Sequence, residues 1–225
     1  MKILLFGATG MIGQAVLKAA IASPRVEAVT IVGRSSADVR EAKVSEVLVR
    51  DLFDLTAISA DLAGHDACIF CIGVSSAFMD EAAYSRLTYD LTLSVARATL
   101  AANPHLTFVY VTGQGTDSSE KGSTMWARVK GKTENALLAM PFKAAYMFRP
   151  GAILPLDGIR PKSPVYVAAY RVLTPLVALL RMARPSWIPT TREIGKAMIV
   201  VAAGEHPKRI LDNADIVALA RDSDL

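Results

Sequence analysis

Residues 7–13 read Gly7-Ala8-Thr9-Gly10-Met11-Ile12-Gly13, directly after an apolar run from Lys2 to Phe6 and at the start of a helical pattern. At such a strand-to-helix turn, one glycine makes the tight turn, a second lets the backbone approach a pyrophosphate, and a third lets the helix pack closely on the strand. The N–H groups and partial positive charge of the helix N-terminus then face the phosphates. The turn therefore predicts a dinucleotide site with contacts from Gly7, Thr9, Gly10, Met11, Ile12 and Gly13.

Short apolar runs alternate with longer helical patterns in the part of the chain before Pro150. The runs are rich in Val, Ile and Phe and mostly apolar on both faces, which is typical of a parallel sheet covered on both sides. The predicted strands are Lys2–Phe6, Ala28–Val32, Val44–Val49, Ala67–Ile72, Thr107–Thr112 and Ala144–Phe148, and the predicted helices are Met11–Ala22, Asp80–Ala102 and Ser123–Met140. This order indicates an α/β protein with a doubly wound parallel sheet, the Rossmann fold.

The pattern changes after Pro150, where prolines surround an apolar helical stretch from Val165 to Ala183. A helix over Thr191–Ala203, a strand over Arg209–Leu211 and a terminal helix capped by Asp212-Asn213 are predicted to follow. We expect one NAD(P)-binding Rossmann domain over residues 1–225, in which residues 151–225 form a small C-terminal helical extension over the substrate side of the site. Residues 165–183 are too interrupted to span a membrane, and a cover over the site, a subunit interface and attachment to a membrane surface remain open for them.

The second predicted strand is followed by Gly33-Arg34-Ser35-Ser36. An NAD site normally places an acid here to bond the ribose 2′-hydroxyl. Arg34 can instead hold a 2′-phosphate through two hydrogen bonds, whereas a carboxylate would repel that phosphate. We therefore expect NADP(H), with NAD(H) less favoured, and contacts from Arg34 and Ser35; an exposed arginine without a ligand is the alternative.

Further cofactor contacts are expected after the third and fourth strands. Asp51-Leu52 follow the third strand, where a carboxylate can accept a hydrogen bond from the adenine amine, although a turn-forming residue is the alternative. Cys71 lies near the end of the fourth strand and Gly73 follows it, where the backbone would lie against the cofactor. The spacing of Cys68 and Cys71 within a strand places their side chains on opposite faces and disfavours a disulfide.

Composition excludes several classes of protein. Of the 225 residues, 52% are hydrophobic and 20% charged, which excludes a disordered chain. The net charge of +4 comes without a basic run, so no nucleic-acid partner is expected. Two cysteines and the lack of a signal-peptide pattern lead us to expect a cytoplasmic protein. The three histidines lie apart from other ligands, so no metal is expected.

The glycine turn, the Arg34 turn, Cys71-Ile72-Gly73 and Phe148-Arg149-Pro150-Gly151 together resemble the short-chain dehydrogenase/reductase superfamily. The sequence is most similar to its atypical branch of small NAD(P)-binding proteins, which includes the Tat-interacting oxidoreductase-like and NmrA-like proteins, often labelled nucleoside-diphosphate-sugar epimerase-like. The resemblance covers residues 1–151 and, more loosely, the helix over 191–203. It implies that the turn containing Pro150 lies beside the nicotinamide.

The resemblance also implies a Tyr-x-x-x-Lys pair on the helix after the fifth strand and a Ser or Thr at the end of that strand. The lysine would hold the nicotinamide ribose and lower the pKa of the tyrosine, which transfers a proton. Here Lys130 stands in the lysine position, but Trp126 replaces the tyrosine. Thr112 is the nearest hydroxyl, while Gly113 is the other candidate for the serine position. An indole N–H does not ionise near neutral pH, so the usual general acid is missing.

Three functions therefore remain open. The protein reduces an unidentified small molecule with another proton source, such as Tyr84, Tyr166, Tyr170 or solvent; or it passes hydride to a redox acceptor such as a quinone or flavin; or it senses NADP(H) without catalysis, through a protein partner. The candidate catalytic residues are Lys130, Thr112 and Tyr84, with core packing as the alternative for each tyrosine. A homodimer is a further open partner.

Overall fold

The structure, a computed structural model, describes residues 1–159 and 177–222. Its sheet has seven parallel strands in the order β3-β2-β1-β4-β5-β6-β7. The strands are β1 (Lys2–Phe6), β2 (Ala28–Gly33), β3 (Val44–Leu48), β4 (Ala67–Phe70), β5 (Thr107–Val111), β6 (Ala144–Phe148) and β7 (Ile210–Leu211). The chain runs outward from β1 to β3 and then returns to β4 on the other side of β1, so the strand order reverses between β1 and β4. The predicted doubly wound α/β fold is confirmed.

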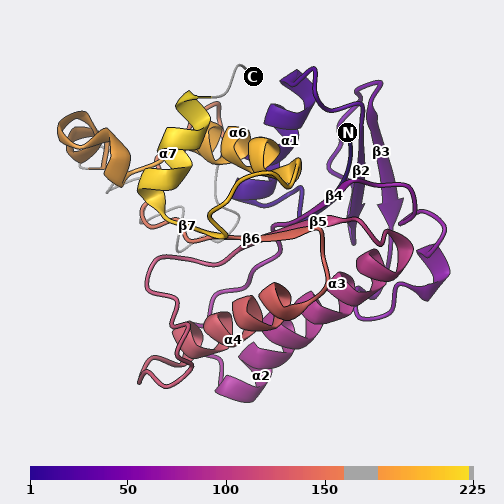
Figure 1. Ribbon diagram of the computed structural model, residues 1–225, viewed down its shortest axis with the longest axis horizontal. Helices are drawn as coiled ribbons and strands as arrows, with labels where there is room; N and C mark the ends of the chain where they lie inside the picture. The colour runs from indigo at the N-terminus through magenta and orange to yellow at the C-terminus, as the bar shows by residue number, and fades with distance from the viewer. Residues whose placement is uncertain (160–176, 223–225) are drawn as a thin grey trace.

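Helices cover both faces of this sheet (Figure 1). One layer holds α1 (Met11–Ala22), α6 (Thr191–Ala202) and α7 (Asn213–Arg221), and the other holds α2 (Glu81–Ser85), α3 (Leu91–Ala102) and α4 (Met125–Ala139). Short turns of helix are η1 (Thr56–Ile58), η2 (Arg86–Asp90) and η3 (Pro185–Trp187). A Cβ on Gly195 would overlap the carbonyl of Ala15, so glycine at this position lets α6 pack closely on α1.

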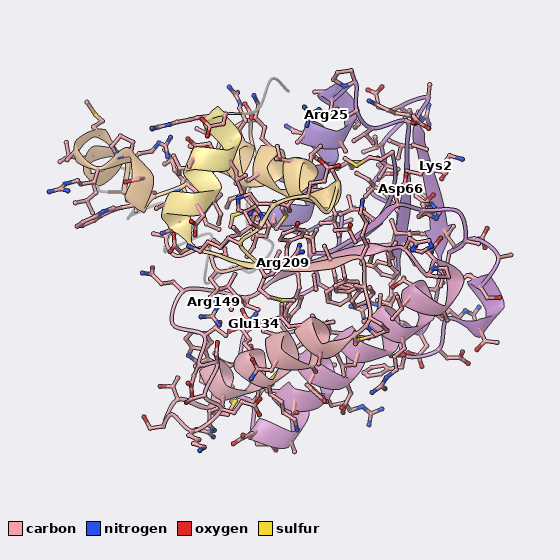
Figure 2. The ribbon with its side chains drawn as sticks, viewed as in Figure 1. Lys2, Arg25, Asp66, Glu134, Arg149 and Arg209 are labelled. Carbon is pink, nitrogen blue, oxygen red and sulfur yellow. The ribbon has the colours of Figure 1, made fainter. Side chains whose placement is uncertain are left out.

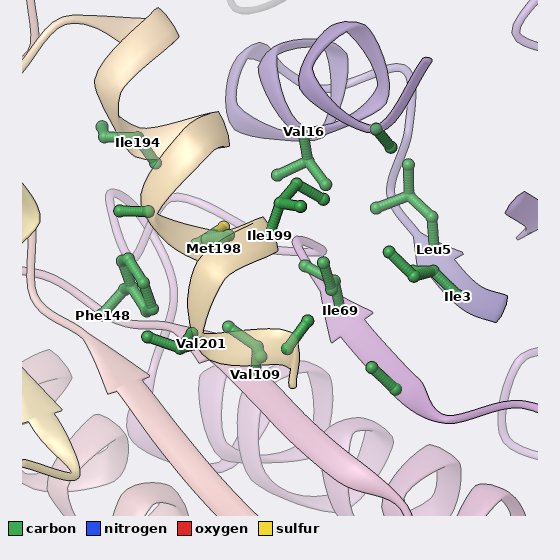
Figure 3. Packing of buried hydrophobic residues seen from close by; sticks show 14 of the residues in the cluster. Ile3, Leu5, Val16, Ile69, Val109, Phe148, Ile194, Met198, Ile199 and Val201 are labelled. Carbon is green, nitrogen blue, oxygen red and sulfur yellow. The ribbon is translucent and has the colours of Figure 1, made fainter. Parts of the chain in front are cut away.

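The core consists of two apolar layers, one on each face of the sheet. Because side chains alternate along a strand, Leu5 of β1 enters one layer and Phe6 enters the other. Figure 3 shows the first layer, in which α1, α6 and the strands interdigitate around Met198 and Ile199. Cys68 and Cys71 contact different layers and are both free thiols, in agreement with the sequence prediction.

The predicted helix over Asp80–Ala102 is interrupted, because the wide π-turn η2 separates α2 from α3. Asp80 caps α2 by accepting a hydrogen bond from the backbone N–H of Ala83 at 2.7 Å. The hydroxyl of Thr92 donates to the carbonyl of Thr88 at 2.5 Å, a bond of the kind that commonly bends helices. Such a turn is frequent at functional sites, and Leu87 within it faces the cavity described below.

The described residues after Pro150 add the helices α6 and α7 and the strand β7 to the fold. The side chain of Thr190 and that of Glu193 cap α6 reciprocally, and β7 pairs with β6 as the seventh strand. Residues 177–183 are helical, whereas Tyr166, Tyr170 and most of the apolar stretch from 165 to 183 lie outside the described residues. A position of residues 151–225 over the site therefore stays a prediction. In the described ranges, no helix combines the length and the apolar character needed to cross a membrane.

Candidate functional site

A cavity of about 380 Å³ opens at the carboxyl end of the sheet, where the strand order reverses. Its wall comes from the turns that follow β1, β2, β3 and β4, together with Leu87 and Leu91. Open α/β sheets bind ligands at this place because neighbouring turns diverge there. The cavity brings together nine residues predicted from the sequence: Gly7, Thr9, Gly10, Arg34, Ser35, Asp51, Leu52, Cys71 and Gly73.

The three glycines of the first turn differ in what surrounds them. Gly7 has a φ of +81°, and a Cβ there would lie 2.8 Å from the backbone of Cys71. A Cβ on Gly13 would overlap the carbonyl of Gly7, so this glycine lets α1 pack against the turn. By contrast, a Cβ on Gly10 would meet only the Gly7 carbonyl, at 3.4 Å. Gly10 therefore leaves open space beside the backbone, as close approach of a ligand requires.

The N-terminus of α1 adds unpaired donors to this open space. Helix geometry leaves the N–H groups of Met11, Ile12 and Gly13 without acceptors in α1, and Gly10 as N-cap has no side chain to cap them. Such an end attracts phosphate through its N–H groups and helix dipole. The turn thus fits the diphosphate of a dinucleotide. Of this turn and helix start, Gly7, Ala8, Thr9 and Gly10 line the cavity, whereas Met11, Ile12 and Gly13 do not.

Two arginines line the same cavity at the turns after β2 and β3. Arg34 and Arg50 are both exposed, and within residues 1–159 and 177–222 neither guanidinium makes a hydrogen bond or ion pair. Arg50 was missed by the sequence reasoning, although it directly precedes the predicted Asp51. One carboxylate oxygen of Asp51 accepts from the N–H of Phe53 at 2.9 Å, so this side chain has the turn-forming role that the sequence left open.

A second polar group lies further along the edge, at the ends of β5 and β6 and on α4. Glu134 is 0% exposed, and Arg149 donates to both of its carboxylate oxygens, from Nε at 3.0 and 3.1 Å (Figure 2). Arg149 also contacts the hydroxyl of Ser118, which ties the loop before α4 to the pair. The sequence analysis missed Glu134 as a functional candidate; the signal was an acid four residues after Lys130, on the same face of the helix.

The hydroxyl of Thr112 is held by this pair. Its Oγ1 lies 2.5 Å from Oε1 of Glu134 and 3.1 Å from the carbonyl oxygen of Phe148. Both neighbours are acceptors, so the single hydroxyl hydrogen of Thr112 points into the protein. Thr112 can therefore accept a hydrogen bond from a ligand, but it cannot donate one without giving up these contacts.

Lys130 lies one helical turn before Glu134. Its Nζ is 3.4 Å from the carbonyl of Thr112 and 3.5 Å from that of Val111, and it lies 5.7 Å from the centre of the Tyr110 ring. Burial lowers the pKa of Lys130 to about 8, and the negative charge of Glu134 offsets this only in part. Lys130 thus sits at the end of β5 as an amine that can change its charge near neutral pH.

The remaining predicted residues fall outside the cavity wall. Pro150 accepts a hydrogen bond from the N–H of Gln114 at 3.0 Å, so it neighbours the turn after β5 that carries Thr112. Tyr84 is 2% exposed within α2, and its phenol adds to the burial that raises the pKa of Tyr110. Cys71 does line the cavity, but burial raises the pKa of its thiol to about 12, which makes it a poor nucleophile.

Known proteins resemble this chain over nearly its whole length. The profile of the NAD(P)H-binding family matches residues 7–145. Protein fmp52-1, mitochondrial, of Aspergillus terreus is 26% identical over 237 residues, covering 98% of this chain and 99% of that protein. Protein HTATIP2 of Rattus norvegicus is 25% identical over 242 residues, covering 99% and 90%. An oxidoreductase of the short-chain dehydrogenase/reductase family from Burkholderia thailandensis shares the fold with a TM-score of 0.68 and 17% identity, covering 96% and 92%.

These comparisons correct the expected cellular location and identify the family. Several fungal relatives are named mitochondrial, which contradicts the cytoplasmic location expected from the cysteine count and the lack of a signal-peptide pattern. The family profile covers more than half of the chain and includes the glycine turn, Arg34 and the turn after β4. The chain belongs to the NAD(P)H-binding family, and it shares its fold with solved short-chain dehydrogenases/reductases.

Proposed function

We propose that this protein binds NADP(H) in preference to NAD(H) and uses it as an oxidoreductase on a small-molecule acceptor. The observation that carries the cofactor choice is the presence of Arg34 and Arg50 on the wall of one cavity with the glycine turn. Two guanidinium groups attract the charge of a 2′-phosphate, whereas NAD sites use an acid at this place. Asp51 is the acid in the cavity, and its bond to the N–H of Phe53 engages it in its own turn.

The rest of the cavity is assigned to the common part of the cofactor. The diphosphate is assigned to the turn of Gly7, Thr9 and Gly10 and to the N–H groups of Met11 and Ile12, while Gly13 acts by close packing. Ser35 is assigned to the 2′-phosphate beside Arg34. Leu52, Cys71 and Gly73 are assigned to the adenosine and diphosphate walls.

The nicotinamide end is assigned to Pro150, Thr112 and Lys130, which share the carboxyl edge of β5 and β6. When bound, the reduced cofactor supplies a hydride. The proton that accompanies it has an unusual source, because Trp126 replaces the tyrosine expected one turn before Lys130. Tyr84 is disfavoured as that source, since it is buried in α2 and lies outside the cavity wall.

A second candidate function is NADP(H) sensing without catalysis, through a protein partner or a second copy of the chain. Trp126 favours it, because an indole stacks on a ring or donates one hydrogen bond but does not ionise near neutral pH. Such a protein would bind cofactor tightly and turn over no acceptor.

Two measurements separate these functions. Calorimetric titration with NADPH and NADH tests cofactor binding and preference, and equal affinities for the two would contradict the role of Arg34. Incubation with NADPH and menadione, benzaldehyde or cyclohexanone, followed by NADPH absorbance, tests turnover. NADPH binding without oxidation of the cofactor on any acceptor would favour the sensing function.

A further inference from the structure

We propose that the ammonium group of Lys130 is itself the proton donor of this site, in the place of the missing tyrosine. The inference rests on the proposed oxidoreductase function and adds the identity of the acid. Two observations support this assignment: the direction of the hydroxyl hydrogen of Thr112, and the hydrogen bonds that Glu134 accepts from Arg149 and Thr112.

The other polar hydrogens at this edge are committed or do not ionise. The hydroxyl hydrogen of Thr112 is directed to Glu134 or to the carbonyl of Phe148. The indole of Trp126 does not titrate near neutral pH. Burial raises the pKa of Tyr110, whose ring lies beneath Nζ of Lys130. Among these groups in the described part of the chain, Lys130, whose Nζ lies beside the end of β5, is thus the one that can give up a proton.

Within the part of the chain that the structure describes, no acid pairs with Lys130, because Glu134 is engaged by other donors. The carboxylate of Glu134 accepts from Arg149 and from Thr112, and in the described ranges Nζ of Lys130 forms no ion pair within 4.0 Å. Its two hydrogen bonds, at 3.4 and 3.5 Å to carbonyls, are long and weak. The ammonium has three N–H groups but only two hydrogen-bond acceptors in these ranges, and its Nζ also lies 5.7 Å from the centre of the Tyr110 ring.

The charges around Lys130 agree with an amine that titrates near neutral pH. Burial is the main influence on its pKa, which falls to about 8, and Glu134 opposes the shift. Arg128 on the same helix is paired with Glu81 of α2. The titratable groups that face Lys130 directly are Glu134 on α4 and Tyr110 on β5. Behind them, Arg149 pairs with Glu134 and Tyr84 acts on Tyr110, while the Arg128–Glu81 pair is neutral as a unit.

The proposed step balances without a further reactant. With reduced cofactor bound, a hydride would pass to a carbonyl carbon and form a C–H bond, and the electron pair of the C=O double bond would move to oxygen. That oxygen takes a proton from Nζ of Lys130, which becomes a neutral amine. The amine then regains a proton from water. The products are an alcohol and the oxidised cofactor.

The test measures the titration of Lys130 and its effect on turnover separately. In protein labelled with ¹³C at lysine Cε, the resonance that disappears in Lys130→Arg should titrate near pH 8. Lys132→Arg is the matched control, since Lys132 is exposed on the same helix and its Nζ lies over the ring of Tyr89 at 4.6 Å. With menadione, benzaldehyde or cyclohexanone, kcat should fall as pH rises through the same midpoint.

Lys130→Arg keeps a positive charge but does not release a proton near neutral pH, so it should lower kcat at least about 100-fold while NADPH still binds by calorimetry. Lys132→Arg should leave kcat unchanged. A Lys130 midpoint close to 10.5, retained turnover in Lys130→Arg, or NADPH binding without turnover on any acceptor would each overturn the proposal. Failure to bind NADPH would instead overturn the proposed function itself, and calorimetry identifies that outcome on its own.

Discussion

Gly10→Val is the sharpest test of the cofactor site, because the structure separates its effect on ligand from its effect on the fold. The backbone at Gly10 is extended, with φ of −78° and ψ of 167°, a conformation that valine adopts readily. A Cβ there meets only the carbonyl of Gly7 at 3.4 Å. The free energy of unfolding without ligand should therefore change by less than about 1 kcal/mol.

The expected loss of binding can be given a size. A ligand present at about 100 times its Kd stabilises the folded state by about 2.7 kcal/mol. In a chain of 225 residues, each kcal/mol shifts the Tm by roughly 2–4 °C. NADPH should therefore raise the Tm of the unmutated protein by roughly 5–11 °C. In Gly10→Val the rise should vanish, because the side chain occupies the space that the diphosphate needs.

Thermal unfolding with and without NADPH, together with calorimetric titration, measures both quantities. The matched control is Gly13→Ala, whose Cβ would overlap the carbonyl of Gly7. This variant should lower the Tm even without ligand, since the turn or α1 must move. If Gly10→Val bound NADPH with unchanged affinity, the diphosphate would lie elsewhere and the assignment of the turn would be wrong.

Three further predictions concern charge. Arg34→Glu should remove or invert the preference for NADPH over NADH, a change of at least about 1–3 kcal/mol in calorimetry, and Arg50→Gln should reduce the preference in the same direction. Arg149→Met should lower the free energy of unfolding in urea by about 3–5 kcal/mol, because it leaves the wholly buried carboxylate of Glu134 unpaired; the double variant with Glu134→Gln should lose less than the sum of the single losses, and additive losses would refute the pairing. Burial lowers the pKa of Lys130 from its ordinary value of 10.5 to about 8, so the unfolded chain binds more protons between these pH values and stability rises with pH across them. Lys130→Met should therefore be more stable than the unmutated protein below pH 8 and lose that advantage as pH approaches 10.5, whereas a pH-independent difference would contradict the lowered pKa.

The order of strands and helices could be predicted because each signal is local. All seven predicted strands agree with the structure within two residues, and Asp212 caps the start of the terminal helix as expected. The π-turn η2 could not be predicted, since the apolar periodicities of α- and π-helices hardly differ over five residues. Its presence depends on tertiary packing around Thr88 and Thr92, which a local pattern does not contain.

The candidate site likewise has one part that the sequence could predict and another that it could not. The cavity wall could be predicted because Gly10, Arg34 and Asp51 each lie in the turn that follows a strand, so the topology alone brings them to one edge. The polar group around Thr112 depends on side chains from three elements. The direction of the Thr112 hydroxyl and the pairing of Glu134 with Arg149 follow from helix rotation and strand spacing, which the sequence pattern does not determine.

The energetics of Lys130 connect stability to function. A desolvated ammonium without a counter-ion raises the free energy of the folded protein, and a methionine of similar size would avoid this penalty. Residues that reduce stability in this way concentrate at functional sites, where a ligand or a reaction needs them. If Lys130→Met stabilises the protein without ligand and also abolishes turnover, the penalty is the consequence of keeping a proton donor in a largely dry site. Lys130 would then compensate for the replacement of the tyrosine by Trp126, because an amine that titrates near neutral pH can release a proton without the help of a phenol.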